Sequence, residues 1–267
     1  MREPHIVVCM KVVPKAEEIQ VDPETLLLKR EGARSEINPP DMNALEVALR
    51  LKDARGAHVT VLSMGPPFFE PILRMALAMG ADDLHLLSDR AFAGADTLAT
   101  TYTLARGIEK LGDVGLILCG EESADGATGQ VPAGIAAWLD LPQVTLINSL
   151  EFEKGLRALR ARREIGGGYT IQRVHLPAVV SIKTAANEPR FMDFRRKPWA
   201  MEQAEVVVWD RASIDADPAY IGLRGSPTVV VGLREAESRE RRQERLDGPP
   251  EQIAHQLAEI LRPLLTE

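Results

Sequence analysis

Apolar runs and helical patterns alternate along most of the chain. The apolar runs, rich in Val, Ile and Leu, cover residues 6–13, 58–63, 83–87, 115–119, 144–147 and 178–182. Runs of this length are typical of buried strands, whereas Met42, Leu45 and Leu49 recur at helical spacing between them. Asp96 is a predicted N-cap for another helix. Strands that alternate with helices predict an α/β fold, a doubly wound and mostly parallel sheet with helices on both faces.

The alternation changes near residue 150. Residues 157–164 and 169–176 flank three consecutive glycines at 166–168, which predicts a β-hairpin. We therefore expect an α/β domain over residues 1–220 that carries a hairpin insertion near 150–176.

The C-terminal part of the chain has a different pattern. Residues 233–245 are charged at almost every position, so they predict a solvated helix or a mobile linker. Apolar residues at helical spacing follow over 253–265 and predict a short amphipathic helix. Its apolar face needs a surface to pack on, either in its own domain or in a partner subunit. We therefore expect a C-terminal arm over residues 221–267.

Composition and charge exclude several classes of function. The net charge is -7 and the pI about 5.4, which argues against broad nucleic-acid binding. The two cysteines, Cys9 and Cys119, lie in apolar runs and are expected to be buried free thiols, as in a reducing compartment. No leader pattern and no apolar run near the ~20 residues of a membrane span is apparent, so the expected location is cytoplasmic. No catalytic or metal-ligating cluster stands out.

Residues 119–132 form the most informative segment of the sequence. They read Cys-Gly-Glu-Glu-Ser-Ala-Asp-Gly-Ala-Thr-Gly-Gln-Val-Pro and connect a predicted strand to a predicted helix. Ligands of open parallel sheets bind at such strand ends. Gly126 and Gly129 allow the backbone to approach a ligand closely, and free amides at the helix start favour an anion such as a phosphate. A plain strand-to-helix turn is the alternative.

A series of short motifs resembles the beta subunit of electron transfer flavoproteins. The motifs include Val7-Val-Cys-Met-Lys-Val-Val-Pro14, Ile37-Asn-Pro39, Ser63-Met-Gly-Pro66, Asn187-Glu-Pro-Arg190 and Gly222-Leu-Arg-Gly-Ser-Pro227. Their order and spacing match the family over most of the chain. The resemblance implies a doubly wound domain of the adenine-nucleotide alpha-hydrolase-like type. It also implies a heterodimer in which the C-terminal arm embraces an alpha subunit that carries FAD.

The resemblance further implies a nucleotide in the beta subunit. One branch of the family binds structural AMP, and the other binds a second FAD that takes a hydride from NADH and splits the electron pair between two acceptors. The AMP branch typically has an acidic run followed by Asn-Gln-Thr, whereas this loop reads Asp125-Gly-Ala-Thr-Gly-Gln-Val131 and is similar to the FAD branch. Residues 91–97 are also similar to that branch. FAD is the expected cofactor and AMP the alternative.

The family pattern places the nucleotide contacts on this sequence by position. They are Cys9, Lys11, Asn38, Gly65, Thr97, Gly120, Asp125, Thr128, Gly129, Gln130 and Val131. Backbone at Cys9 and Gly120 would frame the adenine, and residues 128–131 would hold phosphate. As alternatives, Cys9 is a core residue, Lys11 a surface charge, Asn38 a turn residue and Asp125 a helix cap.

The implied activity is electron transfer, with redox chemistry carried by flavin rather than by side chains. The chain would therefore act as an NADH-dependent oxidoreductase only within a complex. A non-bifurcating shuttle subunit with AMP and a nucleotide hydrolase on the same fold are the alternative functions. A hydrolase on this fold would require a glycine-rich phosphate-binding loop near the first strand, and residues 12–15 do not provide one.

Residues 191–199 depart from the family pattern. Many members have a longer loop here that docks a partner dehydrogenase through a leucine, but this loop is shorter and contains no leucine. Partner docking is expected instead from Phe191, Met192, Phe194, Arg195, Arg196 and Trp199, because aromatic and arginine residues are enriched at interface hot spots. The partner would be a dehydrogenase or a quinone-reducing protein. The alternative is that the aromatic residues pack within this subunit and the basic residues are solvated.

Overall fold

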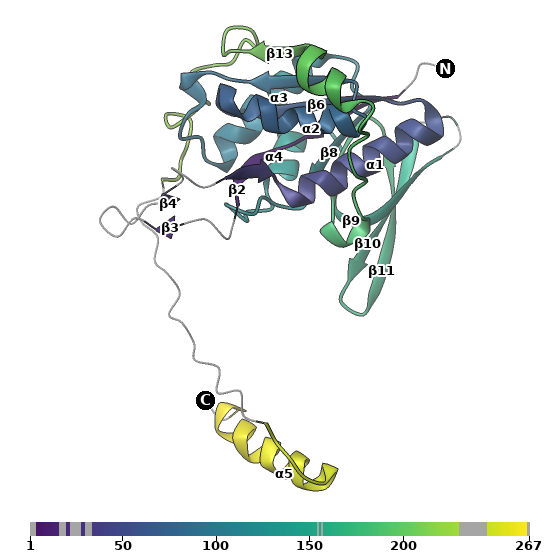
Figure 1. Cartoon of the computed structure of the whole chain (residues 1–267), viewed down its shortest axis with the longest axis vertical. Coiled ribbons are helices and arrows are strands. Elements are labelled where there is room, and N and C mark those ends of the chain that lie inside the picture. Colours follow the sequence, from purple (N-terminus) through teal and green to yellow (C-terminus); the bar gives the residue numbers. More distant parts are fainter. Residues whose placement is uncertain are drawn as a thin grey trace. The chain divides into compact units, whose positions relative to one another are not determined.

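The computed structural model describes residues 4–15, 20–21, 28–29, 34–153, 155, 157–229 and 245–265. The chain divides into two compact units, Met1–Leu233 and Arg234–Glu267. The first unit contains the sheet and its covering helices, and the second contains α5 (Pro250–Leu261) (Figure 1).

A nine-stranded sheet forms the centre of the first unit, in the order β11-β10-β9-β12-β8-β1-β6-β7-β13. Its strands are β1 (His5–Cys9), β6 (His58–Met64), β7 (Asp83–Leu87), β8 (Leu116–Gly120), β9 (Gln143–Phe152), β10 (Ala158–Ile165), β11 (Gly168–His175), β12 (Ala178–Ile182) and β13 (Val206–Trp209). The strands from β9 to β13 in this order pair in parallel, and β10 and β11 extend one edge by antiparallel pairing.

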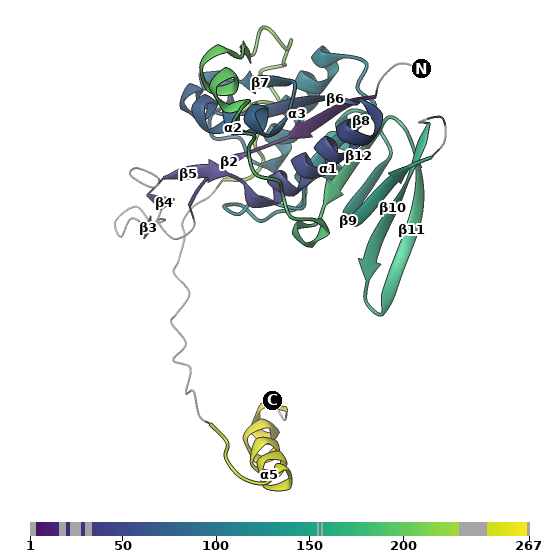
Figure 2. The same cartoon turned by 45° about the vertical axis from the view of Figure 1, so that its right-hand side comes forward.

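Helices cover both faces of the parallel part of the sheet (Figures 1 and 2). Helices α1 (Pro39–Arg55) and α2 (Glu70–Met79) pack with the residues of β1 that face one way, among them Ile6 and Val8. Helices α3 (Thr97–Leu111) and α4 (Val131–Trp138) pack with the alternate residues Val7 and Cys9. Strands buried on both faces are continuously apolar, which explains the runs in the sequence. The predicted doubly wound α/β fold is confirmed.

The order of the strands reverses at β1. The chain passes from β1 through α1 to β6 and through α2 to β7, and then returns through α3 to β8 on the other side of β1. Connections therefore leave β1 and β8 in opposite directions, which opens a crevice at the carboxyl ends of these two strands. In open α/β sheets this topological switch point is where ligands bind.

Short elements complete the first unit. They are β2 (Val12–Pro14) paired with β5 (Ser35–Ile37), β3 (Gln20–Val21) paired with β4 (Leu28–Lys29), the 3-10 helices η2 (Pro67–Phe69), η3 (Arg90–Phe92) and η4 (Thr184–Ala186), and the π-helical turn η5 (Trp199–Gln203). The single strand expected over residues 6–13 is thus two strands. The amide of Met10 still bonds Leu62 of β6, after which the chain leaves the large sheet to pair with β5.

The hairpin and the helix cap that the sequence predicts are confirmed. Strands β10 and β11 pair from Ala158 with His175 to Ile165 with Gly168, and Gly167 in the turn has a φ of 84°. Asp96 caps α3, because its side chain accepts the amide of Ala99. Strand β9 is longer than expected, since it continues past its parallel partner β12 to pair with β10.

The second unit contains α5 (Pro250–Leu261) and the 3-10 helix η6 (Arg262–Leu265). The predicted amphipathic helix is therefore present, and Leu257, Ile260 and Leu261 are between 42% and 48% exposed on it. Its packing on a partner subunit stays a prediction. Most of the charged stretch 233–245 lies outside the described residues. None of the helices in the described ranges has the length and apolar character needed to cross a membrane.

Candidate functional site

A buried carboxylate occupies the crevice between β1 and β8. Asp41 lies in the first turn of α1, and its Oδ2 accepts the amide of Lys11 at 2.8 Å. Its Oδ1 accepts the amide of Gly120, at the end of β8, at 3.1 Å. A Cβ on Gly120 would collide with the carboxylate, so glycine is required there. One side chain thus binds the backbone at the ends of both strands that flank the switch point.

Burial raises the pKa of Asp41 to about 7. The amides of Lys11 and Gly120 and the side chain of Asn38 oppose this shift, because they stabilise the charged form. Removal from water dominates, and the residue is only 7% exposed. Asp41 therefore changes charge near neutral pH, although an ordinary aspartate does so near pH 4.

Asn38 binds the glycine loop to the start of α1. It is 1% exposed, its Nδ2 donates to the carbonyl oxygen of Glu122 at 2.9 Å, and its Oδ1 accepts the amide of Ala124 at 3.0 Å. Its own amide donates to the carbonyl oxygen of Lys11 at 2.8 Å. Every polar group of this side chain takes part in holding the two loops together, which is more than a turn residue needs.

An ion pair closes the network above the strand ends. Lys11 Nζ lies 2.5 Å from Asp125 Oδ1 and 3.5 Å from Ser123 Oγ. The Asp125 side chain is 5% exposed, whereas that of Lys11 is 45% exposed. The lysine compensates the charge of an acid that would otherwise repel a phosphate beside it.

The loop between this network and α4 is exposed. Gly129 has a φ of 62°, in the left-handed region that favours glycine. Thr97 Oγ1 donates to Thr128 Oγ1 at 3.4 Å, so the start of α3 contacts the loop. Helix α4 begins at Val131, and the first amides of a helix lack partners within it. Exposed backbone, a hydroxyl and a helix start are suited to bind a phosphate group.

The structure joins some of the predicted site residues and separates others. Lys11, Asn38, Gly120 and Asp125 share the network described above. Gly65 directly follows β6, on the opposite side of β1 from β8, and its amide donates to the carbonyl oxygen of Leu87 in β7.

Cys9 is placed in the core. Cys9 of β1 lies in register with Cys119 of β8, and both are buried. Their side chains belong to the apolar cluster under α3 and α4. A hydrogen bond with Cys9, together with burial, raises the pKa of the Cys119 thiol well above its usual range. The Cys9 side chain is therefore a core residue, as in the alternative expectation. The expected nucleotide contact through the Cys9 backbone, at the end of β1, stays a prediction.

Two acids with a role in the site were not predicted from the sequence. Asp41 follows Asn38 by three residues, and a carboxyl group at that spacing inside an Asn-Pro-Pro-Asp motif was the available signal. Glu121 Oε1 accepts the amide of Thr184 at 2.8 Å and its hydroxyl at 2.6 Å, which joins the loop after β8 to the start of η4, the turn that follows β12. Nothing in its local sequence distinguishes Glu121 from a solvated acid.

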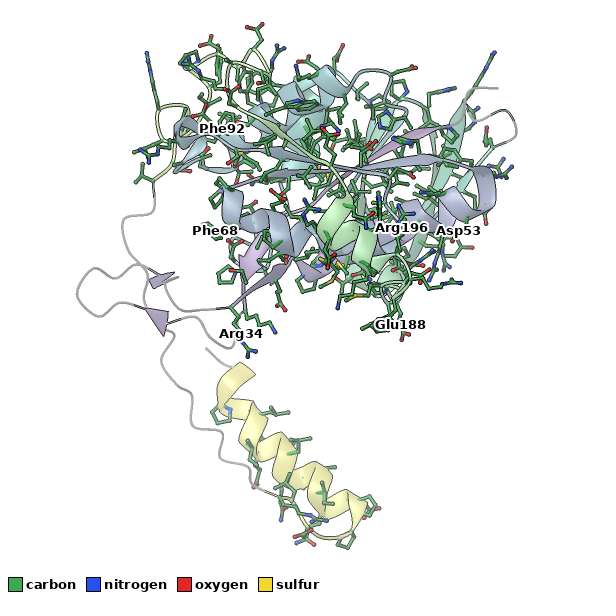
Figure 3. All side chains as sticks on the ribbon, turned by 45° about the horizontal axis from the view of Figure 1, so that its top comes forward. Arg34, Asp53, Phe68, Phe92, Glu188 and Arg196 are labelled. Carbon is green, nitrogen blue, oxygen red and sulfur yellow. The ribbon has the colours of Figure 1, made fainter. Side chains whose placement is uncertain are left out.

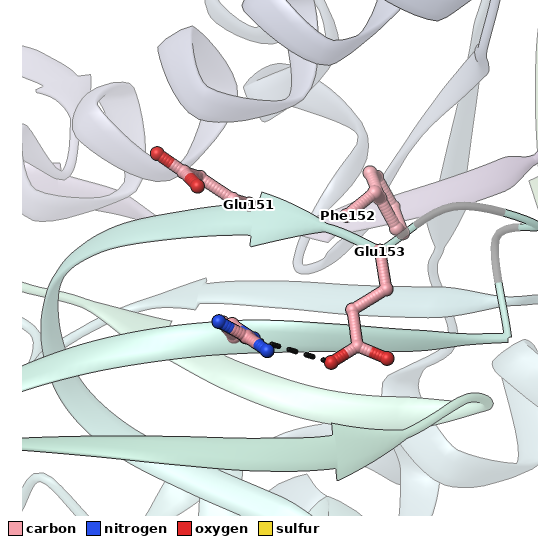
Figure 4. A pocket seen from close by; sticks show the side chains of 4 residues that line it. Glu151, Phe152 and Glu153 are labelled. Atoms are coloured by element: carbon pink, nitrogen blue, oxygen red, sulfur yellow. Dashed lines mark hydrogen bonds and ion pairs between the residues drawn. The ribbon is translucent and has the colours of Figure 1, made fainter.

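A shallow hollow lies elsewhere, on the antiparallel extension of the sheet (Figure 4). It is lined by Glu151, Phe152, Glu153 and Arg160, and Arg160 Nε lies 3.3 Å from Glu153 Oε1. Arg173 also bonds Glu153 and lowers the pKa of its carboxyl. The charge of Glu153 is compensated by Arg160 and Arg173, and the hollow contains none of the expected nucleotide contacts.

The residues expected to dock a partner fall into two groups. Phe191 and Phe194 are 73% and 68% exposed with ring centroids 5.6 Å apart, and Arg195 beside them is exposed. Arg196, labelled in Figure 3, instead packs against this chain: its guanidinium donates to the carbonyl oxygens of Leu77 and Ala81 near the end of α2.

The other two candidates of that loop are partly covered. Met192 packs against the core, and Trp199 lies beneath the Arg196 guanidinium at 4.6 Å. The loop is thus fixed to α2 by its inward residues and presents Phe191, Phe194 and Arg195 to solvent. Their role in docking stays a prediction.

Comparisons with known proteins identify the family. The family model described as "Electron transfer flavoprotein domain" matches residues 25–214. The chain is 46% identical over 226 residues to the electron transfer flavoprotein subunit beta of Clostridium acetobutylicum, covering 85% of this chain and 86% of that one. It is 43% identical to subunit CarD of the caffeyl-CoA reductase-Etf complex of Acetobacterium woodii, with 84% and 85% covered. It is 40% identical to protein FixA of Azotobacter vinelandii, with 94% and 92% covered. The chain belongs to the electron transfer flavoprotein beta subunit family.

Proposed function

We propose that this chain binds FAD at the loop over residues 125–131 and, in a heterodimer with an alpha subunit, passes electrons from NADH or a dehydrogenase to acceptors by bifurcation. The Lys11–Asp125 ion pair is the observation that carries this proposal. The pair holds Asp125, the first residue of the loop, in place. Because the lysine amine compensates the charge of this carboxylate, a diphosphate bound at the loop would be repelled less.

Gly126 gives the loop room for a dinucleotide. A Cβ at this position would meet nothing closer than Ser123 Oγ, at 3.2 Å, so glycine is not required by the packing of the chain itself. The missing side chain therefore leaves space on the outer, exposed side of the loop. The acidic residues that the AMP branch typically carries in this loop would fill that space and add charge near a phosphate. This favours FAD over AMP.

Residues of this chain would bind and position the nucleotide, and bound flavin would supply the redox chemistry. The amides of Gly129, Gln130 and Val131 and the hydroxyl of Thr128 would hold phosphate at the start of α4. Asn38 and Asp41 would keep that loop and the strand ends in position. The relative from Acetobacterium woodii is named as part of a reductase complex, which supports a complex with a redox enzyme for this chain also.

The test is the nucleotide content of the heterodimer. The chain is co-purified with its alpha subunit and denatured, and FAD and AMP are counted per heterodimer. Two FAD molecules and no AMP support the proposal and justify an assay of NADH oxidation with a high-potential and a low-potential acceptor. One FAD with one AMP refutes the bifurcating function and leaves a simple electron shuttle. Absence of any nucleotide from this chain refutes the assignment of the loop.

A further inference from the structure

The segment 222–228, a sequence motif that the site does not use, wraps around the loop that precedes α3. Gly222 has a φ of 54°, and a Cβ there would collide with the carbonyl oxygen of Ala91. The amide of Leu223 donates to the carbonyl oxygen of Ala93 at 3.0 Å. The segment is therefore packed closely against residues 91–96, and it lies just before residue 229, the last described residue of the first unit.

Asp96 is the centre of this contact. Its amide donates to Ser226 Oγ at 2.8 Å. Its Oδ2 accepts both the amide and the hydroxyl of Thr228, at 3.1 and 2.6 Å. Its Oδ1 accepts the amide of Ala99 at 3.1 Å and caps α3. One carboxylate thus joins the start of α3 to the last described residues before the C-terminal part, and hydrogen bonds to a charged group are the stronger kind.

The next residue connects α3 to the nucleotide loop. Thr97 is the first residue of α3, and its hydroxyl contacts that of Thr128. Asp96 and Thr97 are adjacent, and the Asp96 cap holds both in the first turn of one helix. A displacement of Asp96 therefore displaces Thr97. The start of α3 therefore contacts both the loop, through Thr97, and the segment 222–228, through Asp96.

We propose that Asp96 is a positioning residue that couples the segment 222–228, and hence the start of the C-terminal arm, to nucleotide binding. This inference rests on the proposed function, because it requires a nucleotide at the loop. The coupling is reciprocal: a nucleotide that orders the loop and Thr97 strengthens the Asp96–Thr228 contact, and loss of that contact weakens nucleotide binding by the same factor.

Two near-isosteric variants test the coupling in the purified heterodimer. Thr228→Val removes the hydroxyl that Asp96 accepts, whereas Thr228→Ser retains it. Two quantities are measured. The first is the rate at which the nucleotide bound to this chain is released, expressed relative to the FAD content of the alpha subunit. The second is the rate of tryptic cleavage at the arginines within residues 234–245. Cleavage is followed with and without added FAD.

We expect Thr228→Val to release the nucleotide about fivefold faster than the wild type, at the low end of usual coupling. FAD should slow cleavage in the wild type and in Thr228→Ser, and this effect should be lost in Thr228→Val. Asp96→Asn gives an independent check. Asparagine is an equally good N-cap, but when its oxygen caps α3, an NH2 group that can only donate replaces the oxygen that accepts the amide and the hydroxyl of Thr228. It should behave as Thr228→Val does.

The outcomes separate the two proposals. If the wild type retains nucleotide and both variants release it at the wild-type rate with unchanged protection from trypsin, the coupling is wrong and the proposed function stands. If the wild type carries no nucleotide on this chain, the proposed function fails and the coupling fails with it. Faster release in Thr228→Val but also in Thr228→Ser would show a packing effect and would overturn the assignment to the hydroxyl.

Discussion

Replacing Asp41 by asparagine should remove a pH dependence of stability that the wild type has near neutral pH. The Asp41 carboxyl is buried with a pKa of about 7, and an aspartate in an unfolded chain has a pKa of about 3.9. The folded chain therefore binds this proton more tightly than the unfolded chain does. A group with a raised folded-state pKa contributes stability that is complete below about pH 4 and is lost as pH rises through about 7.

The magnitude follows from linkage. With a folded pKa of about 7 and an unfolded chain already ionised, raising the pH from about 6 to about 8 lowers the free energy of unfolding of the wild type by about 1.4 kcal/mol. The asparagine side chain has no proton to lose, so Asp41→Asn should not show this decrease. Its amide group also places a donor against one of the two backbone amides, which costs about 1–3 kcal/mol at every pH and leaves the slope unchanged.

The assay is urea denaturation of the full-length chain at several pH values and fixed salt, for wild type and variant. Contributions of the other titrating groups cancel in the difference between them. Asp210→Asn is the matched control. This exposed carboxylate accepts hydrogen bonds from Ser213 and has a lowered pKa, so it is ionised in both the folded and the unfolded chain between pH 6 and pH 8, and its loss should not change the pH dependence. The reasoning is refuted if wild type and Asp41→Asn lose stability equally between pH 6 and pH 8.

Three further predictions concern the nucleotide and the partner. Lys11→Met should weaken nucleotide retention about tenfold, because it removes the amine that pairs with the Asp125 carboxylate. Lys15→Met, which removes an amine 4.0 Å from Glu36, should not, and equal retention in both variants contradicts this role. Gly126→Glu should lower the FAD content of this chain without unfolding it, as measured on denatured heterodimer, and an unchanged content would show that the space at Gly126 is not used. Phe194→Ala should slow electron transfer to the partner by at least about fivefold at constant flavin content. Ile171→Ala, at a 62% exposed position on β11, should not. Equal rates in the two variants would show that Phe194 is not part of the docking surface.

The strands that the sequence predicts well are the ones buried on both faces. Residues 115–119 are apolar because both faces of β8 are covered, so a short run is a sufficient signal. Strand β9 is longer than its apolar run predicts, because its second half, which pairs with β10, is only partly buried and alternates apolar with polar residues. The break after β1 was missed because residues on both sides of it are buried, in the large sheet first and beside β5 afterwards.

The candidate site shows where a sequence stops being sufficient. Resemblance placed Lys11 and Asp125 among the nucleotide contacts, but 114 residues separate them, and only the fold reveals that they form an ion pair. Asp41 was overlooked because a carboxylate in the first turn of a helix is ordinarily solvated. Its burial results from the convergence of three distant segments on the switch point, which no local pattern encodes.

These contacts divide the site into a frame and a loop. In the frame, Asp41 and Asn38 bind the ends of β1 and β8 through groups that the chain supplies itself, so the strand ends are positioned without help from a ligand. Residues 126–130 of the loop are exposed. The loop is attached to the segment after β1 by the ion pair of Asp125 with Lys11, and to α3 by the contact of Thr128 with Thr97. A nucleotide bound at this site would contact a preformed frame and an exposed loop. Between the two branches of the family, the side chains of this loop differ in size and charge. Selection between a mononucleotide and a dinucleotide should therefore reside in the loop, and substitutions in the frame should change how tightly either is held without changing which one is preferred.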